Sequence, residues 1–189
     1  GDGLQVFQEE DGSYNGRCFA CGTHIHDPYH DKPKNYKPPE PIRKTPEQIA
    51  KELSEIAECV AVTIHSRRLN KTTLDYFGVK VGVSQVDGET PEVLHRPYTK
   101  EGELVAYKNK LLGQKGAWSV GDQRDVDLFG WEQAIRSGTK TLYITEGEED
   151  AMALWQVLTK DNQGTDYEEF IPAVCSLPHG VTSAVKDLL

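Results

Sequence analysis

The chain has no long apolar run, few cysteines and a shortage of positive charge. No stretch approaches the roughly 20 consecutive apolar residues that cross a bilayer, so we expect no membrane association. The first residues lack a basic region followed by an apolar core, so no signal peptide is visible. Four cysteines, at positions 18, 21, 59 and 175, are too few for a disulfide scaffold and favour a reducing compartment. These absences predict a cytoplasmic protein.

The net charge of −9 argues against a surface coated with positive charge for nucleic acid. A local basic groove stays possible, because the distribution of charge steers ligands more than its total does. The 189 residues, 37% hydrophobic and 27% charged, suit a polar globular protein of one large or two small domains. No Gly-x-x-x-x-Gly-Lys-Ser/Thr loop occurs, so the sequence predicts no helicase motor within the chain.

Composition divides the chain into four segments. Residues 1–27 combine glycine, aromatics, cysteine and histidine, and residues 28–45 are rich in proline and lysine, which is typical of an extended linker. Residues 46–138 mix helical and hairpin patterns. Residues 139–189 alternate strand and helix, which indicates a parallel sheet and an α+β or α/β fold.

The hydrophobic periods predict individual elements. The strand at 142–144 is expected to be buried, and core packing is the favoured interpretation of Trp118 and Trp131. The expected helices are 46–58, about 70–77, 131–136, about 150–158 and a last one from 182, and the expected strands are 4–7, 17–20, 79–86, 92–98, 104–110, 142–144 and 173–177.

Carboxylates gather directly after the strand at 142–144. Glu146 ends this strand, Gly147 permits a sharp turn, and Asp150 falls on the first turn of the next helix. Ligands of α/β proteins bind at the carboxyl ends of strands, and paired carboxylates suit Mg²⁺ or proton transfer. The alternative is a solvated acidic turn that only favours the helix dipole.

Cys18 and Cys21 lie two residues apart before a glycine, a spacing that matches two ligands of tetrahedral Zn²⁺. A redox or incidental pair is the alternative, because one pair supplies half of a site. His24, His26 and His30 follow closely and could complete the site, although their spacing is not a usual Cys₂His₂ pattern.

Basic side chains form two further groups. Lys108 and Lys110 are two residues apart on an expected strand and therefore share one face, and Lys115 follows. Arg67, Arg68 and Lys71 form the second group. Solvated surface lysines and a basic patch at a helix start are the alternatives to phosphate binding.

Taken together, these segments resemble the primase portion of bacteriophage primase–helicases, a family related to mitochondrial Twinkle. The Glu-Gly-x-x-Asp-Ala spelling resembles the opening motif of the TOPRIM domain, and residues 3–22 resemble the second half of a zinc ribbon. The stretches that carry the resemblance are Arg68–Phe77, Tyr107–Lys110 with Lys115, Asp127–Gly130, Glu146–Asp150 and Ser176–Gly180.

The resemblance implies a partial zinc ribbon, a linker, a mixed α+β subdomain and an incomplete TOPRIM domain. It implies DNA primase activity in the cytoplasm of a phage-infected bacterium, with single-stranded DNA as template, ribonucleoside triphosphates as substrates, and a helicase and DNA polymerase as partners. Glu146 and Asp150 are the implied catalytic residues, with Glu146 also a ligand of Mg²⁺ or Mn²⁺, while Cys18 and Cys21 hold Zn²⁺. The implied nucleotide-binding residues are Lys108, Lys110, Lys115, Arg68 and His179.

The chain departs from the family at its end. The family continues to an Asp-x-Asp strand and a further acidic residue, whereas Leu189 comes before any of them. We therefore expect a fragment, truncated at both ends and too short to catalyse by itself. A non-catalytic nucleic-acid-binding module and another TOPRIM enzyme, such as a nuclease, are the alternative functions.

Overall fold

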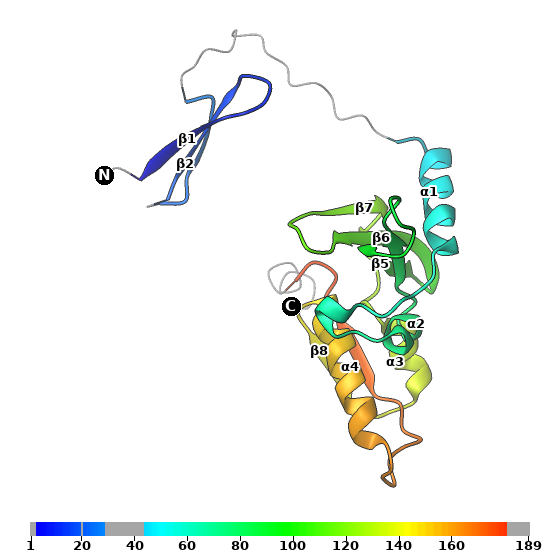
Figure 1. Cartoon of the computed structure of the whole chain (residues 1–189). Coiled ribbons are helices and arrows are strands. Elements are labelled where there is room, and N and C mark those ends of the chain that lie inside the picture. Colours follow the sequence, from blue (N-terminus) through cyan, green and yellow to red (C-terminus); the bar gives the residue numbers. More distant parts are fainter. Residues whose placement is uncertain (1–2, 20, 29–43, 181–189) are drawn as a thin grey trace. The chain divides into compact units, whose positions relative to one another are not determined.

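A computed structural model describes residues 3–19, 21–28 and 44–180 of the chain (Figure 1). The chain divides into two compact units, Gly1–Arg43 and Lys44–Leu189, which are described separately. The expected helix from Thr182, most of the proline-rich segment and His30 lie outside the described residues.

The first unit is a small antiparallel meander of β1 (Leu4–Gln8), β2 (Tyr14–Cys18) and β3 (His24–His26). Its side chains along β1 are all exposed, so this unit has little apolar core. The strand expected at 17–20 is displaced, since β2 ends at Cys18, and β3 was not predicted.

The second unit begins with α1 (Pro46–Glu58), whose bounds match the prediction. Thr45 caps the helix: its hydroxyl accepts from the Gln48 amide, and the Gln48 side chain accepts from the Thr45 amide at 2.8 Å. A short 3₁₀ turn, η1 (His65–Arg67), and helix α2 (Lys71–Tyr76) follow.

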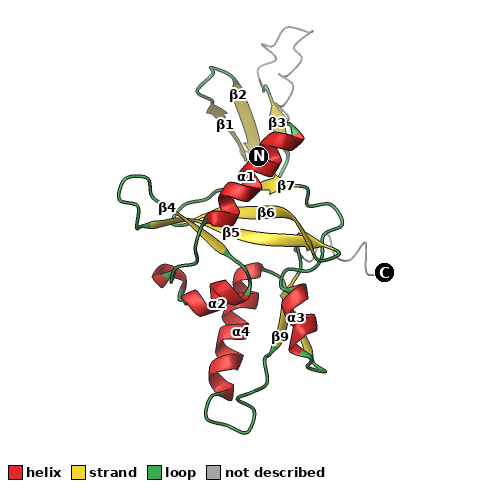
Figure 2. Ribbon diagram, turned by 90° about the vertical axis from the view of Figure 1, so that its right-hand side faces the viewer, coloured by secondary structure: helices red, strands yellow, loops and turns green. Residues whose placement is uncertain are grey.

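Four antiparallel strands form the main sheet in the order β4-β5-β6-β7. Helix α1 lies on one face of this sheet, and α2 and α4 (Glu148–Asn162) lie on the other (Figure 2). The bounds of the strands are Lys80–Val83 for β4, Pro91–Lys100 for β5, Glu103–Leu111 for β6 and Ala117–Gly121 for β7, the last of which was not predicted.

The remaining elements are α3 (Trp131–Ser137), β8 (Leu142–Thr145) and β9 (Ala173–Ser176), with α4 between the two strands. Strands β8 and β9 pair in parallel, which confirms the expected β-α-β order. The expected burial of β8 is wrong, because Leu142, Tyr143 and Ile144 are exposed while β9 is fully buried. Within residues 44–180, β8 pairs only with β9, which leaves its other edge open, whereas α3 and α4 both pack on β9.

One apolar core joins the main sheet to the β8–α4–β9 unit. Phe77 stacks on Phe129 with ring centroids 5.2 Å apart, and Tyr76 stacks on Trp155 at 4.1 Å. Trp118 and Trp131 are exposed, so their expected core packing is wrong.

The described residues thus form three sheets and four α-helices, a mixed α+β architecture that agrees with the predicted class at this level. None of the described helices is long and apolar enough to cross a membrane.

Candidate functional site

A buried carboxylate surrounded by basic groups lies where α4 meets the main sheet. Glu148 is 5% exposed. Its Oε2 accepts from Arg96 Nη1 at 3.0 Å, and its Oε1 accepts from Tyr98 Oη at 2.6 Å and from Lys108 Nζ at 2.7 Å. Both carboxylate oxygens are therefore occupied, and we call these four residues the Glu148 cluster.

Local structure explains why these side chains converge. Glu148 is the first residue of α4, where the amide groups and the helix dipole favour negative charge. Arg96 and Tyr98 are two residues apart on β5 and share one face, and Lys108 is the direct partner of Arg96 on β6. The hairpin face and the helix start thus meet at one point.

The electrostatics of the cluster are set by burial and by opposite charge. Burial acts to raise the pKa of Glu148, but the Arg96 charge and the hydrogen bonds from Lys108 and Tyr98 outweigh it and hold the pKa below its usual value. Burial, followed by the charge of Glu148, raises the pKa of the Tyr98 hydroxyl. The cluster therefore contains an ionised carboxylate and a neutral phenol at neutral pH.

A second carboxylate beside it repeats the pattern. Glu149 forms ion pairs with Lys110 at 2.6 Å and with Arg67 at 3.6 Å. Lys108 and Lys110 share the face predicted from their spacing, and each meets one of the two neighbouring glutamates. Two carboxylates thus face four basic side chains, and the exposed Glu146 and Asp150 nearby bring the local count to four groups of each sign.

The loops at the strand ends close the site. Lys108 Nζ also donates to the Pro178 carbonyl oxygen after β9, at 3.0 Å. His179 Nε2 lies 3.1 Å from the Gln123 carbonyl oxygen, and the Gln123 side chain accepts from Ser119, the β7 partner of Lys108. The predicted His179 is therefore held beside the loop that follows β7.

The predicted catalytic carboxylates lie next to this cluster and are exposed. Glu146 directly precedes Gly147, the N-cap of α4, and Asp150 lies in the first turn of that helix. A β-carbon on Gly147 would lie 3.2 Å from Asp150 Oδ2, and one on Gly180 would lie 3.8 Å from Glu146 Oε1. A side chain at position 147 would therefore crowd Asp150, whereas one at position 180 would make only an ordinary contact with Glu146.

The residues present fit a divalent cation in part. Glu146 and Asp150 supply exposed carboxylate oxygens, the ligands that Mg²⁺ prefers. Within residues 3–19, 21–28 and 44–180, no group of three or more His, Cys, Asp or Glu side chains is arranged around one point. In the described chain, Glu146 and Asp150 are thus two exposed carboxylates close in sequence, without a third such ligand grouped around them.

The predicted zinc ligands lie in the first unit, at the end of β2 and in the turn after it. A hydrogen bond with the Thr23 side chain, 3.1 Å from the sulfur, is the largest of the effects that lower the pKa of the exposed Cys21 thiol to about 7. A thiolate at neutral pH is the form that binds zinc. Cys18 and Cys21 thus fit two of the four ligands.

Two predicted residues are not brought to the cluster. Lys115 is exposed in the turn between β6 and β7. Arg68 is exposed with a left-handed backbone (φ 55°), and its carbonyl oxygen accepts from Gln156 of α4. Among the described residues, the partners of Glu148 and Glu149 include neither of them.

The sequence interpretation missed Arg96, Tyr98 and Glu148. The period-two spacing of Arg96 and Tyr98 on an expected strand was an available signal, because a charged and an aromatic residue share one face there. Glu148 could not be distinguished from its acidic neighbours before the start of α4 was known.

Comparison with known proteins adds no family to this description. A scan against models of protein families found no match, and a search of curated proteins found none either. The chemistry of the site is therefore what indicates the function of the chain.

Proposed function

We propose that the chain belongs to a DNA primase, an enzyme that makes short RNA primers on a single-stranded DNA template. One observation carries the proposal: Lys108 joins the β5–β6 hairpin to Glu148 and to the carbonyl of Pro178. These contacts span 40 and 70 residues of sequence and bring the basic strand to the carboxylate turn, as primer synthesis requires.

The reaction joins two ribonucleotides. The 3′-hydroxyl oxygen of the first attacks the α-phosphorus of the second, the bond to the bridging oxygen breaks, and pyrophosphate leaves. Glu146 is exposed at the end of β8 and takes the hydroxyl proton in this proposal. Glu148 is unsuited to that role, since both of its oxygens already accept hydrogen bonds from buried or half-buried donors.

Basic residues supply the charge that the triphosphate needs. Lys108 is partly exposed and is held by Glu148 and Pro178, so its ammonium group is positioned before nucleotide arrives. Lys110 and Arg67 provide further positive charge beside it. Arg96 is buried and cannot contact a ligand, so it acts by orienting Glu148.

A divalent metal ion, when bound, would neutralise charge on the triphosphate, and Glu146 and Asp150 would provide oxygen ligands. In the first unit, Cys18 and Cys21 would hold zinc and stiffen the end of β2. Arg17, whose guanidinium lies 5.5 Å from the Phe19 ring, is then available to contact template phosphates.

Template-directed synthesis on single-stranded DNA with ribonucleotides and Mg²⁺ tests the proposal, using the full-length gene product that contains this chain. We expect oligoribonucleotides from the unmodified protein, and their loss in Glu146→Gln and Lys108→Ala. Lys51→Ala removes an exposed lysine of α1 and is the matched control, which should retain activity.

The two variants should fail differently. Lys108→Ala should weaken nucleotide binding, whereas Glu146→Gln should bind nucleotide and lose turnover. The proposal would be contradicted if the full-length protein binds single-stranded DNA but makes no oligoribonucleotide on any template tested. That result would favour a non-catalytic binding module.

A further inference from the structure

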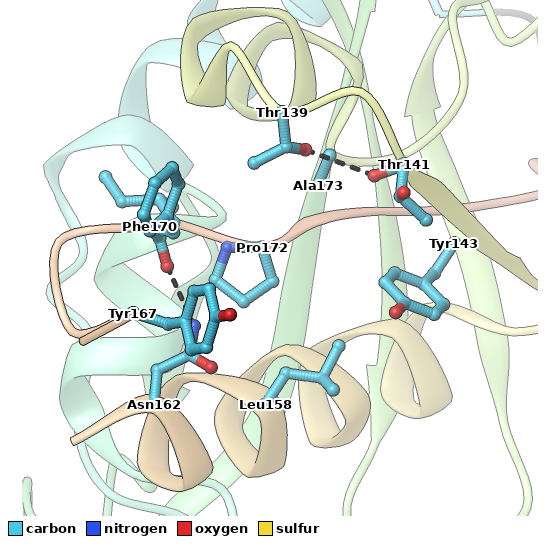
Figure 3. Close-up of a pocket in the computed structure, with 10 residues that line it drawn as sticks. Thr139, Thr141, Tyr143, Leu158, Asn162, Tyr167, Phe170, Pro172 and Ala173 are labelled. Atoms are coloured by element: carbon cyan, nitrogen blue, oxygen red, sulfur yellow. Dashed lines mark hydrogen bonds between the residues drawn. The ribbon is translucent and has the colours of Figure 1, made fainter. Parts of the chain in front are cut away.

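A cavity lies at the end of the β8–α4–β9 unit opposite to the Glu148 cluster. Its volume is about 440 Å³, within the range of ligand pockets. It opens where β8 and β9 begin, whereas the Glu148 cluster lies where these strands end. Figure 3 shows Tyr143 and Leu158 directed toward Pro172, with Tyr167 beside them.

The aromatic side chains around this cavity are exposed although the loop that carries them is ordered. Tyr167 is 64% exposed and Phe170 is 58% exposed. Asn162 Nδ2 donates to the Phe170 carbonyl oxygen at 3.0 Å, and Thr165 Oγ1 donates to the Asn162 carbonyl oxygen at 2.7 Å. These hydrogen bonds fix the backbone of the loop, and the Tyr167 and Phe170 rings lie beside each other with centroids 6.0 Å apart, so binding would cost little backbone entropy.

The loop that supplies Asn162, Tyr167 and Phe170 to the cavity lining is acidic. The stretch from residue 160 to residue 171 contains four acidic residues and Lys160, and Lys140 lies between the lining residues Thr139 and Thr141, so acidic residues still outnumber lysines four to two. This charge repels phosphates and therefore disfavours nucleotides and nucleic acid at this position. It favours a ligand that combines an apolar group with positive charge. The acidic residues are Asp161, Asp166, Glu168 and Glu169.

We propose that this cavity binds a partner polypeptide that inserts an apolar or aromatic side chain flanked by lysine or arginine. Aromatic residues are enriched at the centres of protein interfaces. The apolar lining of Tyr143, Leu158 and Pro172 takes the inserted side chain, and the acidic loop attracts the basic flanks. This inference does not depend on primase activity, because the cavity and the Glu148 cluster lie at opposite ends of the unit.

A displayed library of random peptides, selected on the full chain, tests the proposal. We expect enriched peptides with an aromatic or leucine residue between basic residues. A synthetic copy of the peptide with the highest affinity should bind Phe170→Asp at least about tenfold more weakly than the unmodified chain. The reason is that a carboxylate would then stand among the apolar lining residues. Val86→Asp is the control, since Val86 is 97% exposed on another loop and should leave the affinity unchanged.

Reversing the charge of the acidic loop distinguishes charge-specific peptide binding from nonspecific binding to exposed apolar side chains. The double variant Asp166→Lys/Glu169→Lys should lose the basic peptides and select acidic ones instead. Circular dichroism and thermal unfolding should match the unmodified protein, because both side chains are exposed.

Several outcomes would overturn the proposal. No enrichment, or peptides whose affinity is equal for Phe170→Asp and the unmodified chain, would remove the cavity as a binding site. A dimer in sedimentation that dissociates in Phe170→Asp would instead assign this surface to a second copy of the chain. Loss of oligonucleotide binding in the same variant would assign it to nucleic acid.

Discussion

At the end where β8 and β9 finish, charged side chains are buried and paired, whereas aromatic side chains stand exposed at the end where these strands begin. Glu148 and Arg96 are each about 95% removed from solvent and satisfy one another, while Tyr167 and Phe170 contact water on an ordered loop. The same β-α-β unit therefore presents opposite chemistry at its two ends.

This contrast separates side chains that stabilise the fold from side chains that are available to bind other molecules. A buried ion pair has to be complete, because removing one member leaves an uncompensated charge. Exposed aromatic residues contribute little to folding, so they remain available for contact with a partner.

The largest expected effect is the loss of Glu148. In Glu148→Leu the guanidinium of Arg96, whose side chain is 5% exposed, loses its carboxylate. We expect the free energy of unfolding to fall by about 3–5 kcal/mol, measured by urea denaturation. Glu149→Leu is the matched control: its partners Lys110 and Arg67 are far more exposed, and the expected loss is about 1 kcal/mol or less.

A second variant separates the charge from the packing. The double variant Arg96→Met/Glu148→Leu removes both charges of the buried ion pair. It should therefore lose less unfolding free energy than Glu148→Leu alone. Equal losses in Glu148→Leu and Glu149→Leu would show that burial of the pair does not govern stability at this end.

The two glycines that flank α3 provide the next comparison. Gly130 and Gly138 both have left-handed backbones, with φ of 81° and 66°. A β-carbon on Gly130 would lie 2.7 Å from Phe77 Cε1 and 2.9 Å from the Val174 carbonyl oxygen, whereas one on Gly138 has no neighbour within 4 Å.

We therefore expect Gly130→Ala to lower the free energy of unfolding by roughly 2–4 kcal/mol, through backbone strain and overpacking. Gly138→Ala should lower it by about 1 kcal/mol, through backbone strain alone. Similar values for the two variants in urea denaturation would argue against the close contact of α3 with β9.

Parts of this architecture follow from local signals. Thr45 and Pro46 predict the start of α1 because both residues have a specific role at a helix N-terminus. The spacing of Lys108 and Lys110 predicts their shared face because strands have a period of two. These features depend on neighbours in sequence, so the sequence was sufficient for them.

Other parts depend on distant contacts. Arg96 and Tyr98 are hydrogen-bonded to Glu148 although about fifty residues of sequence separate them, and no local sequence pattern predicts this contact. Four acidic residues lie between 146 and 150, and only the start of α4 at Glu148 decides which one is buried. Burial of β8 was wrongly expected because three apolar residues do not reveal whether a strand has neighbours on both edges.

Titration of Glu148 gives a smaller effect that sharpens the same comparison. Its pKa in the folded chain is below its ordinary value, so the unfolded state binds a proton more readily. The stabilisation from Glu148 is therefore complete above the unfolded pKa of about 4.3 and is lost as pH falls through the folded pKa. Urea denaturation from about pH 6 down to about pH 3 should show a steeper loss for the unmodified chain than for Glu148→Gln. Parallel curves would show that Glu148 contributes nothing to the acid sensitivity.

The smallest effect concerns two thiols, one in each unit, whose pKa values are shifted in opposite directions. The pKa of Cys21 is lowered to about 7, whereas burial raises the pKa of Cys175 to about 11. Because the thiolate is the nucleophile, iodoacetamide at neutral pH with a metal chelator present should modify Cys21 well before Cys175, as read by mass spectrometry of peptides.

Two changes make this last prediction specific. Thr23→Val removes the hydrogen bond to the Cys21 sulfur, so the pKa should rise and alkylation at neutral pH should slow while Cys175 is unaffected. Added Zn²⁺ should protect Cys21 and Cys18 together, because a metal-bound thiolate is no longer a free nucleophile. If zinc leaves both rates unchanged, the pair is not a zinc site, and the lowered pKa of Cys21 reflects only its local turn.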